Sequence, residues 1–261
     1  MAANSFGTNT IIASPLKPQR IAGALLTQDP RIDLLADGAP GPRLFKIKTA
    51  DSFVRRNSAS SLLKHRYSWR GYGAVSLPSE QQANRITLSA LEDEATIGTI
   101  TVGLDGSEGM NSDDIFSDEN NALRAEGRKL CEFTKLAVDP ISGTKRVLAA
   151  LFHVACIMAY RIRKHDTLVI EVNPRHVKYY ERMLGFRVIA PARMNRTVNA
   201  PAVLLMADLS YIMGQVEQFG GQMELAAEER SLYPFFFSID EEIRMVTKLM
   251  AAQRAGAATV N

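Results

Sequence analysis

The middle of the chain alternates short apolar runs with longer helical segments, and this alternation limits the fold more than any other feature. Residues 130–138 and 167–172 are short and mostly apolar, as expected of buried strands. Between them, residues 144–163 have the length and apolar content of a long helix. A second helix is predicted at 173–185, because Asn173 suits the N-cap, a proline follows it, and Gly185 suits the position just past the end. Strands and helices in this order predict a mixed α/β sheet covered by helices.

Hairpin-like patterns flank this central unit. Residues 85–91 alternate apolar with other side chains, an acidic turn follows, and residues 96–104 end in the same alternation, which predicts an antiparallel pair. Weaker signals predict a strand at 44–48, a helix at 51–67, a polar loop at 105–118, a short helix around 121–127, and a last pair of strands at 186–189 and 203–209.

The two ends of the chain differ from this regular part. Residues 1–43 are rich in proline, glycine, alanine and aspartate and show no sustained period, so we expect a poorly structured lead-in. The folded domain is expected to cover residues 44–210, with a helical extension, residues 211–261, packed on it. In that extension Ser238 and Glu241 have the spacing of a capping box, ahead of apolar residues at helical spacing.

Composition excludes some classes of function. A formal charge of +3 is too small for a protein that neutralises nucleic-acid phosphates, although mild basicity suits an acidic protein partner. The most apolar stretch, residues 147–160, is interrupted by His153 and is too short to span about 30 Å of hydrocarbon, so no membrane span is expected. Cys131 and Cys156 lie in apolar runs and are expected to be reduced core thiols. With no signal peptide visible, they favour a cytoplasmic protein.

Several catalytic motifs do not occur. The four histidines have no zinc-binding spacing, so no metal site is expected, and His153 is expected to be a hydrogen-bonded core residue. There is no Gly-x-Ser-x-Gly elbow for an acyl-serine mechanism. The run at 143–145 lacks the spacing of a phosphate-binding P-loop, so nucleotide hydrolysis is unsupported.

Two runs carry a resemblance to a known family. Residues 131–140 read Cys-Glu-Phe-Thr-Lys-Leu-Ala-Val-Asp-Pro, and residues 172–186 combine Val-Asn-Pro-Arg-His with Tyr-x-x-Met-Leu-Gly-Phe. With segments 66–72 and 123–132, they resemble the GNAT acyltransferases and, more narrowly, the N-acyl amino acid synthases, which are relatives of the acyl-homoserine-lactone synthases. The resemblance covers about residues 44–210. It implies a mixed, mostly antiparallel sheet in which a central parallel pair of strands splays apart.

The resemblance implies a transferase that moves a long-chain acyl group from a carrier thioester to the α-amine of an amino acid. An enzyme alternative is a homoserine-lactone-type signal synthase, although the acidic pattern of those enzymes is not evident near residues 69–89. A different alternative is a catalytically silent module that binds an acyl chain or its carrier and regulates. The retention of Glu132 argues against that module.

The loop after the central strand bears on the acyl donor. GNAT enzymes that use free coenzyme A usually cradle its pyrophosphate with a glycine-rich loop, and here residues 141–147 lack the second half of that pattern. An acyl carrier protein offers phosphopantetheine with a single phosphodiester, so we expect this donor rather than acyl-coenzyme A, and no tightly bound cofactor. The residues expected to hold the phosphate at the helix start are Ser142, Gly143, Thr144, Lys145 and Arg146.

Two features of the central strand are candidates for catalysis. The resemblance implies that Glu132 can be the general base, directly or through water; the alternative is a carboxylate that pairs with Arg124 or Arg128 to fix the preceding loop. It also implies that the backbone of Leu136 to Val138 bulges and turns an N–H toward the thioester oxygen. A regular ladder edge is the alternative there.

The second helix offers further candidates. GNAT enzymes often protonate the leaving thiolate with a tyrosine four residues before the glycine, where this chain has Glu181, so Tyr180 is one residue out of position. Packing of Tyr179 and Tyr180 on the sheet is the alternative. Asn173 can bond the pantetheine amides, and its capping role is compatible with this. The residues expected to line an apolar acyl slot are Phe133, Leu168 and Ile170.

Overall fold

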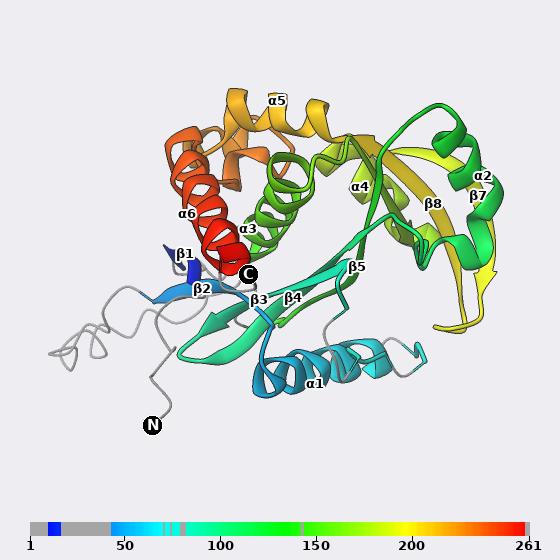
Figure 1. The fold of residues 1–261 in the computed structure, drawn as a ribbon, viewed down its shortest axis with the longest axis horizontal. Helices are drawn as coiled ribbons and strands as arrows, with labels where there is room; N and C mark the ends of the chain where they lie inside the picture. The colour runs from blue at the N-terminus through cyan, green and yellow to red at the C-terminus, as the bar shows by residue number, and fades with distance from the viewer. Residues whose placement is uncertain are drawn as a thin grey trace, which may run out of the picture.

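The computed structural model describes residues 10–16, 43–69, 71–73, 75–78, 82–141 and 144–258. These residues form an eight-stranded sheet with helices on both faces (Figure 1). The strand order is β1-β2-β3-β4-β5-β6-β8-β7, and all neighbouring pairs are antiparallel except β5 and β6. The predicted mixed, mostly antiparallel sheet is therefore confirmed. The strands are β1 (Thr10–Pro15), β2 (Leu44–Thr49), β3 (Arg85–Glu92), β4 (Ala95–Leu104), β5 (Leu130–Val138), β6 (Thr167–Val172), β7 (Arg187–Asn195) and β8 (Ala200–Asp208).

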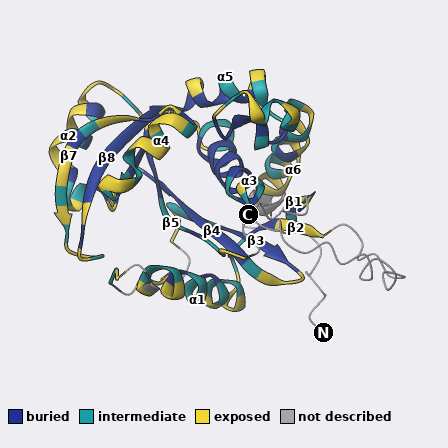
Figure 2. Cartoon of the chain, turned by 180° about the vertical axis from the view of Figure 1, so that it is seen from behind, coloured by how far each residue is buried: buried dark blue, intermediate teal, exposed yellow. Residues whose placement is uncertain are grey.

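Helices cover the two faces of the sheet unequally. Figures 1 and 2 show α3 and α6 together on one face and α1 on the other, where α1 keeps a largely exposed outer side. The helices are α1 (Phe53–Trp69), α2 (Asp113–Ala125), α3 (Lys145–Cys156), its π-helical continuation η2 (Ile157–Ile162), the 3-10 turn η3 (Pro174–His176), α4 (Val177–Leu184), α5 (Leu209–Phe219), the 3-10 segments η4 (Met223–Ala227) and η5 (Tyr233–Phe235), and α6 (Ile239–Ala258).

The main core lies between the sheet and α3. Side chains alternate between the faces of a strand, so Phe133 of β5 and Ile170 of β6 join this core. Leu130 and Val169, from the same two strands, belong instead to a smaller cluster with α2, β7 and β8. The alternation thus gives the central strands an α3 face and an α2 face, and it decides which side chains meet on each.

The central elements have the predicted bounds, and the differences lie in the periphery. The helix α2 begins eight residues earlier than predicted, inside the expected polar loop. The prediction missed this start because many polar residues surround the buried Phe116 and Leu123 and weaken the apolar pattern. The strand β7 continues to Asn195, since an exposed edge strand has little apolar signal. Part of the expected lead-in, Thr10–Pro15, pairs with β2; residues 1–9 and 17–42 lie outside the described residues.

The C-terminal extension packs against α3. Its capping box forms as predicted: Glu241 N–H donates to Ser238 Oγ, and Ser238 N–H donates to the Glu241 carboxylate. The ring of Phe237 stacks on His153, and both are fully buried. His153 Nδ1 accepts a hydrogen bond from Phe237 N–H, and its Nε2 lies 3.1 Å from Glu242 Oε2. The prediction of a satisfied core histidine is therefore confirmed.

We expect acid to weaken this contact through His153. Burial lowers the pKa of His153 and outweighs the opposite effect of the Glu242 carboxylate. The folded pKa then lies below the unfolded value of about 6.5, so stability is lost as the pH falls below about 6.5, by at most about 1.4 kcal/mol per pH unit. His153→Gln keeps a donor and an acceptor without titrating. In urea denaturation it should lose less stability than the parent protein between about pH 8 and about pH 5.

Glu242 also makes the folded protein less stable as the pH falls. Burial alone would raise its pKa, but hydrogen bonds from His153 and Arg161 lower it overall, so its contribution is also lost on acidification. The difference between parent and His153→Gln therefore reports on the histidine together with its effect on Glu242. Parallel losses of stability in the two proteins would show that His153 is not the group that responds.

Candidate active site

The two parallel strands separate after three residues. Residues 130–132 of β5 pair with residues 167–169 of β6, and no further pairs follow between them. Each strand then stays with its outer neighbour, since β5 pairs with β4 as far as Val138 and β6 pairs with β8 as far as Val172. A cavity of about 780 Å³ is lined by both separated ends. The predicted splay of the central parallel pair is confirmed.

A bulge in β5 lies where the strands separate. Residues 134 and 137 of β5 pair with residues 101 and 99 of β4, so Lys135 and Leu136 share one partner position. Lys135 has a left-handed φ of +51°, which is uncommon for a residue with a side chain. The bulge lies slightly earlier than predicted, because Val138 is already in regular register with Gly98. Leu136 and Val138 both line the cavity, and their predicted role toward the thioester oxygen stays a prediction.

The walls of this cavity differ in character. The α3 side is apolar, whereas the α2 side carries polar and charged groups. Residues of the apolar wall include Phe133, Leu148, Phe152, Ile170 and Val172. Residues of the polar wall include Asn111, Asp114, Thr134, Glu171 and Asn195. Phe133 and Ile170 thus line the cavity as predicted for the acyl slot, but Leu168 does not, because it lies in the paired segment opposite Cys131.

The segment after α1 reaches across to the far end of the sheet. Tyr72 accepts a hydrogen bond of 2.9 Å from Arg175 Nη2, and the guanidinium lies over its ring. Gly73 N–H donates to the Val198 carbonyl in the β7–β8 hairpin at 3.0 Å. A Cβ at residue 73 would lie 2.8 Å from the Thr197 carbonyl oxygen, so glycine permits this approach. Since Tyr72 and Val198 both line the cavity, these contacts help to close it.

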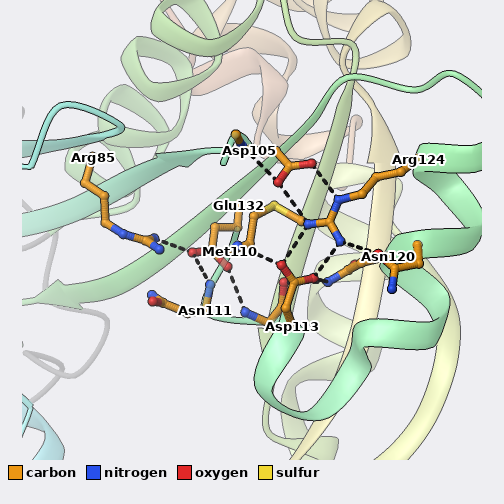
Figure 3. A network of polar contacts seen from close by, with 11 residues as sticks. Arg85, Asp105, Met110, Asn111, Asp113, Asn120, Arg124 and Glu132 are labelled. Atoms are coloured by element: carbon orange, nitrogen blue, oxygen red, sulfur yellow. Dashed lines mark hydrogen bonds and ion pairs between the residues drawn. The ribbon is translucent and has the colours of Figure 1, made fainter. Parts of the chain in front are cut away.

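Glu132 is held in a polar network next to the cavity (Figure 3). Its carboxylate forms an ion pair with Arg85 and accepts hydrogen bonds from the backbone N–H of Asn111 at 2.9 Å and of Ser112 at 3.1 Å. The residue is 1% exposed and does not line the cavity. Gly103 makes room for the pair, because a Cβ there would lie 2.6 Å from Arg85 Nη1. The carboxylate therefore holds the loop before α2 against β5, and its role as general base stays a prediction.

The two arginines considered as partners of Glu132 bind elsewhere. Arg124 donates to Asp105 at 2.8 Å and to Asp113 at 2.7 Å, which ties α2 to the loop after β4 (Figure 3). Arg128 donates to Asp208 at the end of β8, also at 2.7 Å. The alternative of a loop-fixing carboxylate is thus realised at Glu132, but with Arg85 in place of the expected partners.

A second, smaller cavity of about 140 Å³ lies between α1 and the sheet. Its walls carry three cationic side chains, Arg56, Arg85 and Lys135, and one acidic residue, Asp51, which is already ion-paired. Arg56 Nε is buried with no hydrogen-bond partner among the described residues. Burial lowers the pKa of Lys135, the charge of Arg85 acts in the same direction, and Glu132 opposes both. Lys135 also lines the larger cavity, so it connects the two sites.

The helix start expected to hold the donor phosphate is described in part. Ser142 and Gly143 lie outside the described residues. Thr144 is the N-cap of α3, with its hydroxyl accepting from Val147 N–H at 3.3 Å. Lys145 is exposed at the first position of the helix. Thr144 and Lys145 therefore stand at an accessible helix N-terminus, and their contact with a phosphate stays a prediction.

Arg146 has different partners from those expected. Its guanidinium donates to the carbonyl oxygens of Phe235 and Phe236, lies 3.3 Å from Ser14 Oγ, and stacks over the Phe237 ring. These contacts tie the C-terminal extension and β1 to α3. The guanidinium of Arg146 is therefore occupied by packing contacts, whereas a contact with the donor phosphate was predicted.

Tyr180 and Asn173 both line the larger cavity. The Tyr180 ring centroid lies 6.3 Å from that of Phe152 and 5.9 Å from that of Phe186, so the ring packs on the core while reaching the cavity. Asn173 accepts from Arg175 N–H at 3.2 Å, as an N-cap does. Packing and capping are therefore present, and the catalytic and pantetheine-binding roles of these two residues stay predictions.

Several polar residues of the cavity were not among the predicted site residues, and two of them, Glu171 and Asn195, contact each other. Glu171 is the one charged residue in the strand Thr-Leu-Val-Ile-Glu-Val, and a lone carboxylate in an apolar strand is a signal that could have identified it. Asn195, which donates to Glu171 Oε2 at 2.7 Å, lies beyond the predicted end of its strand. Nothing in its local sequence indicates this contact.

The described part of the chain gives no sign of a metal site or of a membrane span. No group of three or more His, Cys, Asp or Glu side chains is arranged there to hold a metal ion. No helix of that part has both the length and the apolar character needed to cross a bilayer. Cys131 and Cys156 are buried and unpaired, as predicted for core thiols.

A sheet that opens between two parallel strands beside a bulge, with an apolar wall facing a polar one, is the architecture of a GNAT-type acyltransferase. The family model described as N-acyl amino acid synthase FeeM matches residues 58–208. The chain therefore belongs to the FeeM family of N-acyl amino acid synthases, and it is an acyltransferase. The resemblance seen in its motifs is confirmed.

Comparison with solved structures finds similar chains. FeeM, an N-acyl amino acid synthase from uncultured soil microbes, is 26% identical over 68% of this chain and 96% of FeeM, with a TM-score of 0.59. An acyl-CoA N-acyltransferase from Pseudomonas aeruginosa is 13% identical over 62% of this chain and 97% of its own, with a TM-score of 0.44. The AHL synthase LasI is 13% identical over 63% of this chain and 89% of LasI, with a TM-score of 0.41. Comparison with curated protein sequences gives no match.

We expect removal of the Glu132 charge to destabilise the fold. Glu132→Gln leaves Arg85, whose side chain is 15% exposed, without its counter-charge, and breaking one side of a buried pair costs about 3 kcal/mol. Urea denaturation should show this loss. The matched control is Glu126→Gln, which removes a 61% exposed partner of Arg128 and should change stability by less than about 0.5 kcal/mol. Equal effects in the two variants would contradict the described network.

Proposed function

We propose that this chain transfers a long-chain acyl group from the phosphopantetheine thioester of an acyl carrier protein to the α-amine of an amino acid. The observation that carries the proposal is the cavity of about 780 Å³ between β5 and β6. Its volume is in the range of cavities that enclose small ligands. The acyl chain would lie against the apolar α3 side, and the amine would approach the thioester from the polar α2 side.

The proposed chemistry uses groups that border the cavity. The backbone from Leu136 to Val138 lies on the edge of β5 that has no strand partner, so an N–H there can donate to the thioester oxygen as negative charge develops. The amine nitrogen bonds to the carbonyl carbon, and the carbon–sulfur bond breaks. In this proposal Tyr180 gives a proton to the leaving thiolate.

The start of α3 supports a carrier-bound donor. Lys145 is exposed there beside the first backbone N–H groups of the helix, while Arg146 is engaged with the C-terminal extension. One exposed cation at a helix N-terminus suits a single phosphodiester better than the pyrophosphate of coenzyme A. Asn173, which lines the cavity, would bond the pantetheine amides. A cytoplasmic site of action is part of the proposal, in keeping with two unpaired cysteines.

The smaller cavity supports an acceptor that carries a carboxylate. Three cations line it, and Lys135 makes no hydrogen bond or ion pair with the described residues. The carboxylate and the α-amine of an amino acid are bonded to the same carbon. A carboxylate held by Lys135 would therefore bring the amine to the bulge, where the larger cavity begins.

We expect purified protein to form an N-acyl amino acid when it is incubated with acyl-loaded carrier protein and a mixture of amino acids, as detected by mass spectrometry. The matched reaction with acyl-coenzyme A of the same chain length should be slower. An acyl lactone formed from S-adenosylmethionine would favour a signal synthase instead. Binding of the loaded carrier without turnover would favour a regulatory module, and equal rates with both donors would contradict carrier specificity.

We expect Lys135→Met to weaken recognition of the acceptor carboxylate. Loss of one charge-assisted hydrogen bond should raise the KM for the amino acid about 10–100-fold. The decarboxylated amine of the same side chain should react alike with parent and variant. Lys178→Met, which removes an exposed lysine of α4, is the matched control. A variant that affects amino acid and amine equally would rule out a carboxylate contact at Lys135.

A further inference from the structure

Two carboxylates from neighbouring strands face the same side of the sheet where β5 and β6 part. Glu132 of β5 stands opposite Val169 of β6 at their last paired position. Glu171 lies two residues further along β6 and faces the same side as Val169, because side chains alternate along a strand. Of the two carboxylates, Glu171 alone lines the larger cavity. It therefore faces the space in which the amine and thioester are proposed to meet.

The hydrogen bonds of Glu132 are all made to groups of the protein. Its Oε1 receives Arg85 and the Asn111 N–H, and its Oε2 receives the Ser112 N–H at 3.1 Å. These three donors come from the protein itself and fix both carboxylate oxygens in place. The side chain is also sealed from solvent, at 1% exposure for the residue.

The bonding of Glu171 is incomplete by comparison. Its Oε2 accepts one hydrogen bond, from Asn195 Nδ2 at 2.7 Å. Its Oε1 has no hydrogen-bond partner among the described residues. Asn195 is itself fixed, because its side-chain oxygen accepts from the N–H groups of Thr197 and Val198 in the hairpin turn. One oxygen of Glu171 is thus oriented by the protein while the other is free to meet a substrate.

The surroundings of Glu171 adjust its affinity for a proton. Burial raises its pKa to about 7; the hydrogen bond from Asn195 opposes the shift, and the charges of Glu132 and Asp114 reinforce it. A base with a pKa near the working pH combines a large ionised fraction with a strong tendency to take a proton. The other cavity-lining side chains that carry charge or titrate near neutral pH are Arg66, Asp114, Lys135 and His176.

The other strand of the same polar wall holds an unsatisfied hydroxyl. Thr134 of β5 lines the cavity, and its Oγ1 is buried without a hydrogen-bond partner among the described residues. Its place in β5, two residues after Glu132, puts it on the α2 face together with Glu171. Buried hydroxyls usually have a partner, so this one indicates a ligand atom between the two strands. An amine, which has several N–H donors, can donate to both Thr134 and Glu171.

We propose that Glu171 is the catalytic base of the transfer and that Glu132 is a positioning residue. The α-ammonium group of the amino acid first gives one proton to Glu171 Oε, and the free amine then bonds to the thioester carbon and loses a second proton as the amide forms. The carbon–sulfur bond breaks, the thiolate leaves with the electron pair and takes up a proton, and Glu171 later returns its own proton to solvent. This inference rests on the proposed acyl transfer to an amine.

The test is the pH dependence of kcat/KM for the amino acid, measured with acyl-loaded carrier on four proteins. The parent enzyme should lose activity below a pKa near 7. Glu171→Gln should be slower by about 10²–10⁴-fold and should no longer show this loss. Glu132→Gln, although less stable, should still lose activity at low pH. The loss should begin at lower pH than in the parent, because the negative charge that raises the pKa of Glu171 is gone. His176→Gln should also lose activity at low pH, which would exclude His176 as the group whose protonation causes the loss.

A change of nucleophile separates catalysis from structure. The nitrogen of hydroxylamine is unprotonated at neutral pH, so Glu171→Gln should slow its acylation much less than that of the amino acid.

A second variant, Asn195→Asp, keeps the turn-forming oxygen and replaces the donor by a negative charge. It should move the low-pH loss of activity to higher pH.

Three results would overturn the inference: Glu171→Gln at the parental rate, Glu171→Gln with the low-pH loss intact, or equal slowing of both nucleophiles. A parent enzyme that acylates no amine at all would instead overturn the proposed function, and this inference with it. The two failures are therefore distinguishable in one set of reactions.

Discussion

Each of the two parallel strands at the centre of the sheet keeps its antiparallel neighbour along its outer side after the two strands part, and this division of partners leaves both inner edges facing the cavity. β5 follows β4 to Val138, and β6 follows β8 to Val172. Beyond their three paired residues, the inner edges of the two strands carry backbone N–H and C=O groups that have no strand partner among the described residues, and a ligand in the cavity can bond to them. The bulge at Lys135 adds a local bend in the part of β5 that pairs with β4 but no longer with β6, so the opening coincides with a feature of the backbone.

The same backbone sorts the side chains into two chemical environments. Phe133 and Ile170 face α3 and give an apolar wall, whereas Thr134 and Glu171 face α2 and give a polar one. An acyl thioester with an incoming amine needs both, because its chain is apolar and its reacting centre develops charge. The ion pair of Glu132 with Arg85 completes the polar side by fixing the loop that carries Asn111.

The sequence allowed accurate prediction of elements whose signal is local. The bounds of Leu130–Val138 and Thr167–Val172 follow from short apolar runs, and the helix end at Gly185 follows from its left-handed φ of +73°. Contacts between distant residues were beyond such signals. Arg85, the partner of Glu132, lies 47 residues away, and the backbone oxygen that engages Arg146 lies 89 residues away. The position of the bulge depends on the register between two strands, which no single segment encodes.

The central claim is that the acyl thioester lies between β5 and β6, and photoaffinity labelling tests it most directly. A pantetheine thioester whose acyl chain ends in a photoreactive group would be bound to the full chain, irradiated, and mapped by peptide mass spectrometry. The account predicts labels on the apolar wall formed by Phe133, Leu148, Phe152 and Ile170, and competition by acyl-loaded carrier protein. Labels confined to residues outside this cavity, unaffected by the carrier, would contradict it.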